Sequence, residues 1–437
     1  MNRLCGLCLL VLCAVAGVPV FAQQPPQATE LPSSPFFIKN TWIIGGKGPW
    51  DYLTLDADTG RLFIAHGRVV QVVDVKTGTL AGQIAGLQEA HAIALDSSGE
   101  YGYISDGLAD QVKIFDRRSL QIVATVATGP GPQALVLDAQ SGLLFAICTN
   151  PIVAPQQQSP PGKPQSSAGA NGRPVPRNPT AQRGGDREVK TSISVIDVVA
   201  RRHVGQILMP GKLGFAQSDG NGQVFVLLVD RNQVARLDAS AIAELLHVHS
   251  DGAASNPPTT EPDTAADGSA TTMLDWSHET RPAESAQEMM RIFPLGSECR
   301  DPLSLAVDGA HQRLFAACSN MKLAVLNSGT GEMVASLPIG PGADTVGFDA
   351  SRGLIYTANG DAQGTLTIIH QDVTDTYAEI QNLATRRRAR TMAVNTDTGQ
   401  VYLVTDYMGV DLAHQGGIGS LKSTPVEGSF QVLVIGH

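Results

Sequence analysis

The stretch LTLDADTGRLFIAHGRVVQVVDVKTGTLAGQI, residues 53–84, decides the fold, because it holds four short strand-like segments separated by turn signals. Residues 53–55 alternate apolar and polar side chains with the period of two that a half-buried strand shows. Residues 56–60 have the composition of a tight turn, in which Asp accepts backbone hydrogen bonds and Gly supplies a positive φ. Further strands are expected over 61–65, 69–73 and 80–84. Four antiparallel strands in about 35 residues match one blade of a β-propeller.

The same pattern recurs along the 437 residues of the chain. The turn after the first strand begins at seven positions: Asp56, Asp96, Asp138, Ser218, Asp308, Asp349 and Asn395. Four of the six gaps are 40, 42, 41 and 46 residues, close to the length of a blade, and the other two, 80 and 90, each equal one blade plus an insertion. The recurring Asp residues are interpreted as turn caps, because a single active site would not repeat in every blade.

The seventh repeat stops after its third strand, which ends in VLVI at 432–435. A strand of the missing kind, TWIIG at 41–45, stands at the other end of the chain. We predict that this N-terminal strand becomes the outer strand of blade seven and closes the ring without an exposed sheet edge. The prediction is therefore an all-β fold: a seven-bladed β-propeller of four-stranded antiparallel blades, spanning residues 40–437.

Several stretches carry a family resemblance: HAIALDSSGEYGYISDG (91–107), CRDPLSLAVDGAHQRLFAACSN (299–320), RARTMAVNTDTGQVYLVTD (388–406), FAICTN (145–150) and YTAN (356–359). They resemble the YVTN-repeat propellers, and more closely the bacterial YncE-like members of that group, over essentially all of residues 40–437. The resemblance implies the propeller architecture. It implies no single function, because relatives range from surface proteins to lactonase-like and quinoprotein propellers.

The first 22 residues are typical of a secretory signal peptide, with Arg3 followed by an apolar run and a Val-Phe-Ala end at Ala22. We therefore expect a periplasmic or secreted protein, cut near Ala22, with a disordered tether over 23–39. No other stretch is long and apolar enough to span a membrane. The formal net charge of −10 argues against nucleic acid as the main partner. Oligomeric state is left open.

Three loop insertions interrupt the repeat, at about 151–190, 250–290 and 409–428. The first is rich in Pro, Gln, Gly and Ser and cannot bury a core. The second is similar but also carries Met273-Leu274-Asp275-Trp276 and Met289-Met290. Both are interpreted as tolerated surface loops. The alternative is that the apolar part of the second insertion caps a face or docks a partner.

Candidate binding positions follow from the repeat, because loops joining outer to inner strands and loops joining second to third strands share one face of a propeller. The starts of the inner strands give one set: Asp51, His91, Gln133, Leu213, Leu303, Asp344 and Arg390. The ends of the second strands give another: His66, Asp106, Cys148, Leu228, Cys318, Asn359 and Thr405. The candidate ligand-binding residues are the polar members Asp51, His66, His91, Asp106, Gln133, Asp344, Asn359 and Arg390.

Blades one and two place two His and two carboxylates in one sector: Asp51, His66, His91 and Asp106. Such a set could hold a divalent metal or act as an acid/base pair. The competing interpretation is that Asp and Asn at strand ends only cap turns. Because no local metal-ligand spacing accompanies the four residues, we assign no metal site, no cofactor and no catalytic residue.

One basic run, Arg386-Arg387-Arg388-Ala389-Arg390, lies on the loop into blade seven. It is interpreted as a solvated loop, or alternatively as a recognition site for an anionic group. The sequence contains no GxSxG elbow, no CxxCH motif and no strand-to-helix Gly-rich loop. It therefore favours a non-catalytic binding propeller whose partner is a small molecule, an anionic ligand or a protein. The alternative is a hydrolase or lactonase-like enzyme that uses the Asp51, His66, His91 and Asp106 sector, with or without a metal.

Three cysteines remain after the signal peptide: Cys148, Cys299 and Cys318. Cys299 lies on the loop into blade five, and Cys318 ends the second strand of the same blade. Because the first two strands of a blade are antiparallel neighbours, we predict a Cys299–Cys318 disulfide and a free Cys148. The alternative is three separate thiols.

Overall fold

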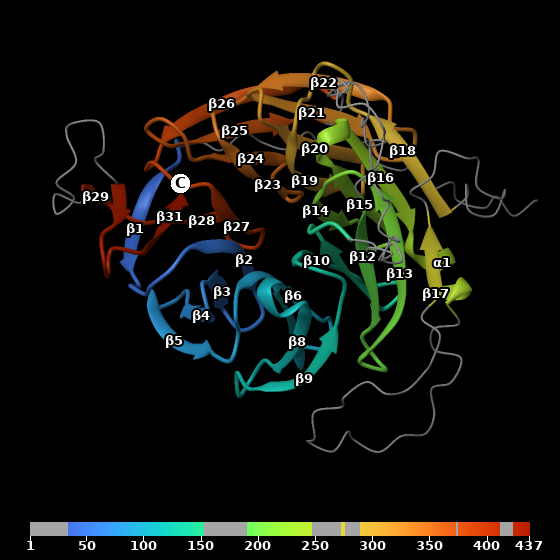
Figure 1. Ribbon diagram of the computed structural model, residues 1–437. Coiled ribbons are helices and arrows are strands. Elements are labelled where there is room, and N and C mark those ends of the chain that lie inside the picture. The colour runs from blue at the N-terminus through green and yellow to red at the C-terminus, as the bar shows by residue number, and fades with distance from the viewer. Residues whose placement is uncertain (1–33, 153–189, 247–271, 276–288, 373–374, 411–422) are drawn as a thin grey trace, which may run out of the picture.

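The computed structural model describes residues 34–152, 190–246, 272–275, 289–372, 375–410 and 423–437. Seven sheets surround a central axis, and the inner strand of each faces that axis (Figure 1). The predicted all-β, seven-bladed fold is confirmed. The predicted signal peptide and most of the predicted tether and loop insertions lie outside the described residues.

In blades one to six the strands follow chain order from the channel outward. Blade one consists of β2 (Trp50–Asp56), β3 (Arg61–His66), β4 (Val69–Asp74) and β5 (Thr79–Ile84). Blade two consists of β6 (Ala90–Leu95), β7 (Tyr101–Asp106), β8 (Gln111–Asp116) and β9 (Ile122–Ala127), with the short helix η1 (Gly107–Ala109) after β7. Blade three consists of β10 (Pro132–Asp138), β11 (Leu143–Cys148), β12 (Lys190–Asp197) and β13 (Arg202–Pro210).

The later blades follow the same order. Blade four consists of β14 (Leu213–Ser218), β15 (Gln223–Leu228), β16 (Gln233–Asp238) and β18 (Met290–Pro294), with η2 (Val229–Arg231) after β15 and α1 (Ala239–Leu245) after β16. Blade five consists of β19 (Pro302–Asp308), β20 (Arg313–Cys318), β21 (Lys322–Asn327) and β22 (Met333–Pro338). Blade six consists of β23 (Ala343–Asp349), β24 (Leu354–Asn359), β25 (Thr365–Gln371) and β26 (Tyr377–Ala384).

Blade seven is assembled from both ends of the described chain: β27 (Thr391–Asn395), β28 (Gln400–Thr405), β31 (Gln431–Gly436) and β1 (Phe37–Ile43). β1 pairs antiparallel with β31, from Phe37 opposite Gly436 to Ile43 opposite Gln431. The predicted ring closure is confirmed. The strand begins before residue 40, the predicted start of the propeller, because Phe36 is buried and its backbone bonds the amide side chain of Gln381 in blade six.

Two insertions contribute strands of their own. β17 (Thr272–Asp275) pairs in parallel with β13 and becomes a fifth strand outside blade three (Figure 1). The side chain of Leu274 packs against the core between blades three and four. Between β28 and β31, β29 (Met408–Val410) and β30 (Ser423–Pro425) form a two-stranded hairpin. Part of the second insertion therefore packs on a blade, unlike a wholly solvated loop.

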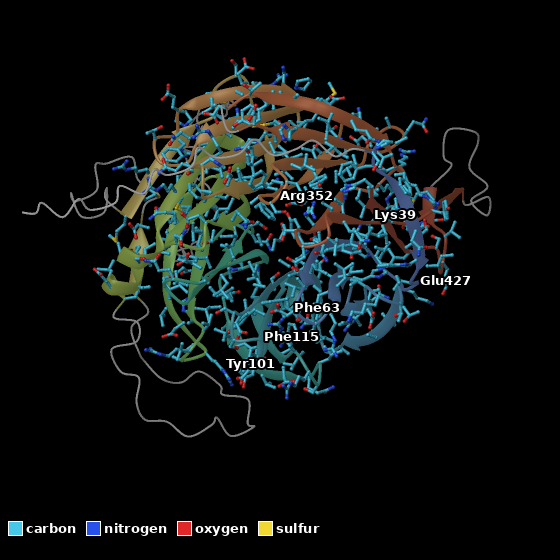
Figure 2. All side chains as sticks on the ribbon, turned by 180° about the vertical axis from the view of Figure 1, so that it is seen from behind. Lys39, Phe63, Tyr101, Phe115, Arg352 and Glu427 are labelled. Carbon is cyan, nitrogen blue, oxygen red and sulfur yellow. A yellow bond between two sulfur atoms is a disulfide. The ribbon has the colours of Figure 1, made fainter. Side chains whose placement is uncertain are left out.

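The core consists of seven apolar clusters, one between each pair of neighbouring blades. Phe63 of blade one and Phe115 of blade two, for example, meet with ring centroids 5.6 Å apart (Figure 2). Because second and third strands are covered on both faces, they read as continuous apolar runs instead of alternating ones. Among the described residues, no helix is long and apolar enough to cross a membrane.

The recurring Asp residues cap turns in the structure. Asp138 accepts the backbone N–H of Ser141 at 2.8 Å, and Asp349 accepts that of Ser351 at 3.0 Å. At the turn after the third strand, Asp116 accepts the N–H of Ser119 at 2.7 Å. These carboxylates belong to the architecture and leave the channel mouth to other residues.

Candidate binding face at the channel mouth

The seven inner strands enclose a channel cavity of about 480 Å³ that every blade helps to line. Two aromatic rings meet across it: Tyr52 of blade one and Phe215 of blade four have ring centroids 5.2 Å apart. Blades one and four are not neighbours, so this pair bridges the channel. Tyr52 and Phe215 are each the third residue of their inner strand.

Strand register fixes two rings of positions on this face. Trp50 pairs with His66, Ala90 with Asp106, Pro132 with Cys148, Pro302 with Cys318 and Ala343 with Asn359. The positions one residue after the first partner form the mouth ring, which holds Asp51, His91, Gln133, Leu303 and Asp344, with Arg390 directly before β27 in blade seven. In blade four the predicted Leu213 is wrong, because Leu213 itself pairs with Leu228 and is buried in the core, which leaves Gly214 at the mouth position. The second-strand ends form the clip ring: His66, Asp106, Cys148, Leu228, Cys318, Asn359 and Thr405.

The mouth ring is charged over four consecutive blades, from blade six through blade seven to blade two. Nδ1 of His91 lies 2.7 Å from Oδ2 of Asp51, and its Nε2 lies 3.4 Å from Oε2 of Glu89. In the same sector, Nε of Arg390 lies 3.1 Å from Oδ2 of Asp344. The side chains of Asp344 and Arg390 are 36% and 52% exposed. These groups are paired with one another yet remain open to a ligand.

Burial and the neighbouring carboxylates together shift the pKa values of three groups in this sector. Burial lowers the pKa of His91, but its hydrogen bond and ion pair with Asp51, helped by Glu89, raise that pKa above the usual range overall. Burial raises the pKa of Asp344; Arg390 opposes the rise, and the negative charges of Asp51 and Asp361 add to it. Burial also raises the pKa of the Tyr52 hydroxyl, with Asp51 and Asp344 as further causes. We call Asp51, Glu89, His91, Asp344, Asp361 and Arg390 the mouth cluster.

The clip ring is buried, and in blades one, two, five and seven it fastens the loop that enters the blade. Asp106 accepts hydrogen bonds from the backbone N–H groups of Gln88 (2.9 Å) and Glu89 (2.8 Å). Nε2 of His66 lies 3.0 Å from the carbonyl oxygen of Gly48, and Nδ1 lies 2.8 Å from Oε1 of Gln71. The Thr405 hydroxyl donates to the carbonyl of Arg387 at 2.9 Å. These contacts hold the loops in place.

Blade five uses a covalent clip. Cys299 on the incoming loop and Cys318 at the strand end form a disulfide, with Cα atoms 5.3 Å apart. Cys148 of blade three is buried and free. By register the counterpart of Cys299 in blade three is Gly129, which has no side chain to offer. Its N–H instead donates to the hydroxyl of Ser194 at 2.9 Å.

The predicted four-residue sector of blades one and two is therefore divided. Asp51 and His91 lie together at the mouth, whereas His66 and Asp106 are 2% and 0% exposed and bonded within the protein. Asn359 is also fully buried and donates to the hydroxyls of Thr365 and Thr367. Gln133 is exposed at the mouth. Among the described residues, no group of three or more His, Cys, Asp or Glu side chains is arranged to hold a metal ion.

The basic run on the loop into blade seven is mostly paired. Arg388 lies 3.0 Å from a carboxylate oxygen of Asp406 and stacks over the Trp50 ring at 4.6 Å. Arg386 donates to the side-chain oxygen of Gln431 at 2.9 Å. Arg387 is exposed. Only part of this run is thus a free solvated loop.

Several mouth residues had no signal in the sequence. Tyr52, Phe215 and Glu89 are ordinary strand or loop residues, and their meeting depends on ring closure. Thr345, at the level of the aromatic pair, lines the channel and is 7% exposed; its hydroxyl has no hydrogen-bond partner among the described residues. A second cavity of about 280 Å³ lies between blades seven and one, lined in part by Trp50, His66 and Phe430.

Comparison with known proteins shows the fold of the chain but not its family. No family model and no curated protein matches the chain. Among solved structures, a chain of the "Crystal Structure of Mitotic Checkpoint Complex" matches with a TM-score of 0.57 and 12% identity, covering 89% of this chain and 95% of that one.

Two further structures match to a similar degree. "Structure of U3-55K" has a TM-score of 0.56 and 10% identity, covering 90% of this chain and 97% of that one. "Crystal structure of RRP9 WD40 repeats" has a TM-score of 0.56 and 10% identity, covering 94% and 99%. The seven-bladed fold is thus shared with WD40-repeat propellers, while membership of the YVTN or YncE-like group is not shown.

Proposed function

We propose that this chain is a binding propeller, without chemistry of its own, that takes its ligand or protein partner at the channel mouth. The observation that carries the proposal is the contrast between the two rings. The clip ring is buried and fully used by the fold, whereas the charged half of the mouth ring is part-exposed around an aromatic floor. Few, well-placed polar groups over an apolar floor are the usual composition of a ligand site.

Export belongs to the same proposal. The first 22 residues read as a signal peptide. The Cys299–Cys318 disulfide supports an oxidising compartment such as the periplasm or the exterior. Compartment fractionation and N-terminal sequencing of the protein made in a bacterial host should find it outside the cytoplasm, with a new N-terminus near residue 23. An uncut cytoplasmic protein would contradict export.

The binding role is tested by a thermal-shift screen with cationic, neutral and anionic small molecules, followed by titration of the hits. Asp51→Ala, His91→Ala and Arg390→Ala should keep the fold and weaken the binding of hits that use the mouth. Asp58→Ala, at an exposed turn that follows β2, is the matched control. Hits that bind all three mouth variants normally would place the site elsewhere.

A hydrolase or lactonase-like activity is the second candidate. It is favoured only by the 2.7 Å contact of His91 with Asp51, which suits acid/base chemistry. Two of its four proposed residues, His66 and Asp106, are committed to loop contacts. An activity screen with lactones and esters, with and without divalent metals, decides between the candidates. Turnover that disappears in His91→Ala would establish the enzyme.

A further inference from the structure

The mouth cluster carries more negative than positive charge. Its carboxylates are Asp51, Glu89, Asp344 and Asp361. Its cations are Arg390 and, when protonated, His91. With His91 protonated, two negative charges remain unbalanced. Burial is the main cause of the raised pKa of Asp344, and the negative charges of Asp51 and Asp361 add to the rise. A bound cation would relieve this repulsion.

The groups beneath the mouth cluster also suit a cation. The rings of Tyr52 and Phe215 lie in the channel with centroids 5.2 Å apart and planes tilted by 52°, and aromatic faces attract positive charge. At the same level, the Thr345 hydroxyl is buried and without a partner among the described residues, although buried hydroxyls are usually bonded. A hydroxyl oxygen can accept a hydrogen bond from a bound donor. The carboxylates, the aromatic faces and this hydroxyl oxygen would therefore all attract a positively charged N–H donor.

A metal ion fits this arrangement poorly. Divalent ions need several oxygen or nitrogen ligands around one point. Among the described residues no three such side chains converge. An ammonium group needs only single hydrogen bonds and can lie against aromatic carbons.

We propose that the channel mouth binds an organic ammonium group, held by the carboxylates of Asp51 and Asp344, the faces of Tyr52 and Phe215 and the hydroxyl of Thr345. This inference rests on the proposed function and names its ligand class. The ammonium group comes either from a small amine or from a lysine side chain of a partner protein. Both sources share the same chemistry and are separated by experiment.

Isothermal titration with n-butylammonium and with Nα-acetyl-lysine amide tests the inference, with n-butanol and Nα-acetyl-norleucine amide as uncharged controls. The two amines should bind and the controls should not. Asp344→Asn and Asp51→Asn should each weaken amine binding about tenfold or more, because each removes a charged hydrogen-bond partner. Asp58→Asn changes the net charge equally but lies outside the mouth, and it should have no effect. Binding should weaken as salt is raised.

If Nα-acetyl-lysine amide binds at least about tenfold more tightly than n-butylammonium, the source is a lysine side chain of a protein, because the backbone groups of the amide then add contacts. Equal affinities identify a free amine. Amine binding that is unchanged in both Asn variants overturns the inference. So does a mouth that takes acetate or phosphate and loses it in Arg390→Ala.

Two further variants guard against misfolding. Thr345→Val keeps shape and charge and should weaken amine binding while leaving the melting temperature close to that of the wild type. Lys76→Gln, on an exposed turn, is its control. If the screen yields neutral or anionic ligands that depend on mouth residues, the proposed function stands and the ammonium inference fails. If no ligand depends on them, both fail.

Discussion

The mouth ring and the clip ring lie on the same face and both contain Asp and His, but they differ in what their side chains contact. In the clip ring, the Asp106 carboxylate accepts hydrogen bonds from two neighbouring backbone N–H groups and is 0% exposed. In the mouth ring, the Asp344 carboxylate pairs with a half-exposed arginine and is itself 36% exposed. An Asp at a strand end therefore serves the fold in one ring and is available to a ligand in the other.

The difference follows from the blade geometry. The end of a second strand abuts the loop that enters its own blade, so a polar side chain there can bond the loop backbone, as His66, Asp106 and Thr405 do. The start of an inner strand borders the channel, where side chains such as Asp344 and Asp51 pair with residues of the next blade. Position within the blade, more than residue type, thus separates fold from function.

The largest effect is expected from Asp106→Ala. It would remove two hydrogen bonds to a charged acceptor, those from the part-buried N–H groups of Gln88 and Glu89, so we expect a loss of about 3 kcal/mol or more in unfolding free energy. Urea unfolding measures it. Asp51→Ala is the matched change in the mouth ring. Equal losses in the two variants would remove the distinction between the rings.

The covalent clip should rank next. Replacing Cys299 and Cys318 together by Ser opens a loop with a sequence separation of 19, for which chain entropy predicts a loss of about 3 kcal/mol, less any strain in the native state. Reductant should lower the melting temperature of the wild type toward that of the double variant and leave the variant unchanged. A wild type that melts identically with and without reductant would show that this clip adds nothing.

A smaller effect is expected at Thr405, whose hydroxyl holds the Arg387 carbonyl. Thr405→Val keeps the shape and removes one hydrogen bond, so unfolding free energy should fall by about 1 kcal/mol. Arg390→Ala, on the same loop but in the mouth ring, should cost less than about 0.5 kcal/mol, because exposed ion pairs contribute little. Denaturant midpoints compare the two directly. A larger loss of unfolding free energy in Arg390→Ala than in Thr405→Val would contradict the difference between the two rings.

The smallest effect is a pH dependence from His91. Its pKa is raised in the folded protein, so its pairing with Asp51 and Glu89 stabilises the fold fully below the unfolded pKa of about 6.5. This contribution is lost as pH rises through the folded pKa. The stability difference between wild type and His91→Gln should therefore be larger near pH 5.5 than near pH 8. Asp51→Asn should reduce the same dependence, and a difference that grows with pH would contradict the assignment.

The sequence predicted positions better than contacts. The turn residues set the strand register, and fixed residue counts from each turn then located the clip ring and the mouth ring, except for the mouth position of blade four. What a side chain does at its position depends on the neighbouring loop, so His66 and Asp106 could not be told from Asp51 and His91. The meeting of Tyr52 with Phe215 is set by the closed ring alone. The parallel addition of β17 to blade three likewise had no local signal.

The most direct test of the binding role is a crystal structure of protein purified without denaturation, then soaked with n-butylammonium. We expect density for the amine at the channel mouth, beside Asp51 and Asp344 and above the Tyr52–Phe215 pair. The clip residues His66, Asp106 and Thr405 should be unmoved. Density confined to the cavity beside Trp50 and Phe430, or a mouth that stays empty while an amine binds in solution, would contradict it.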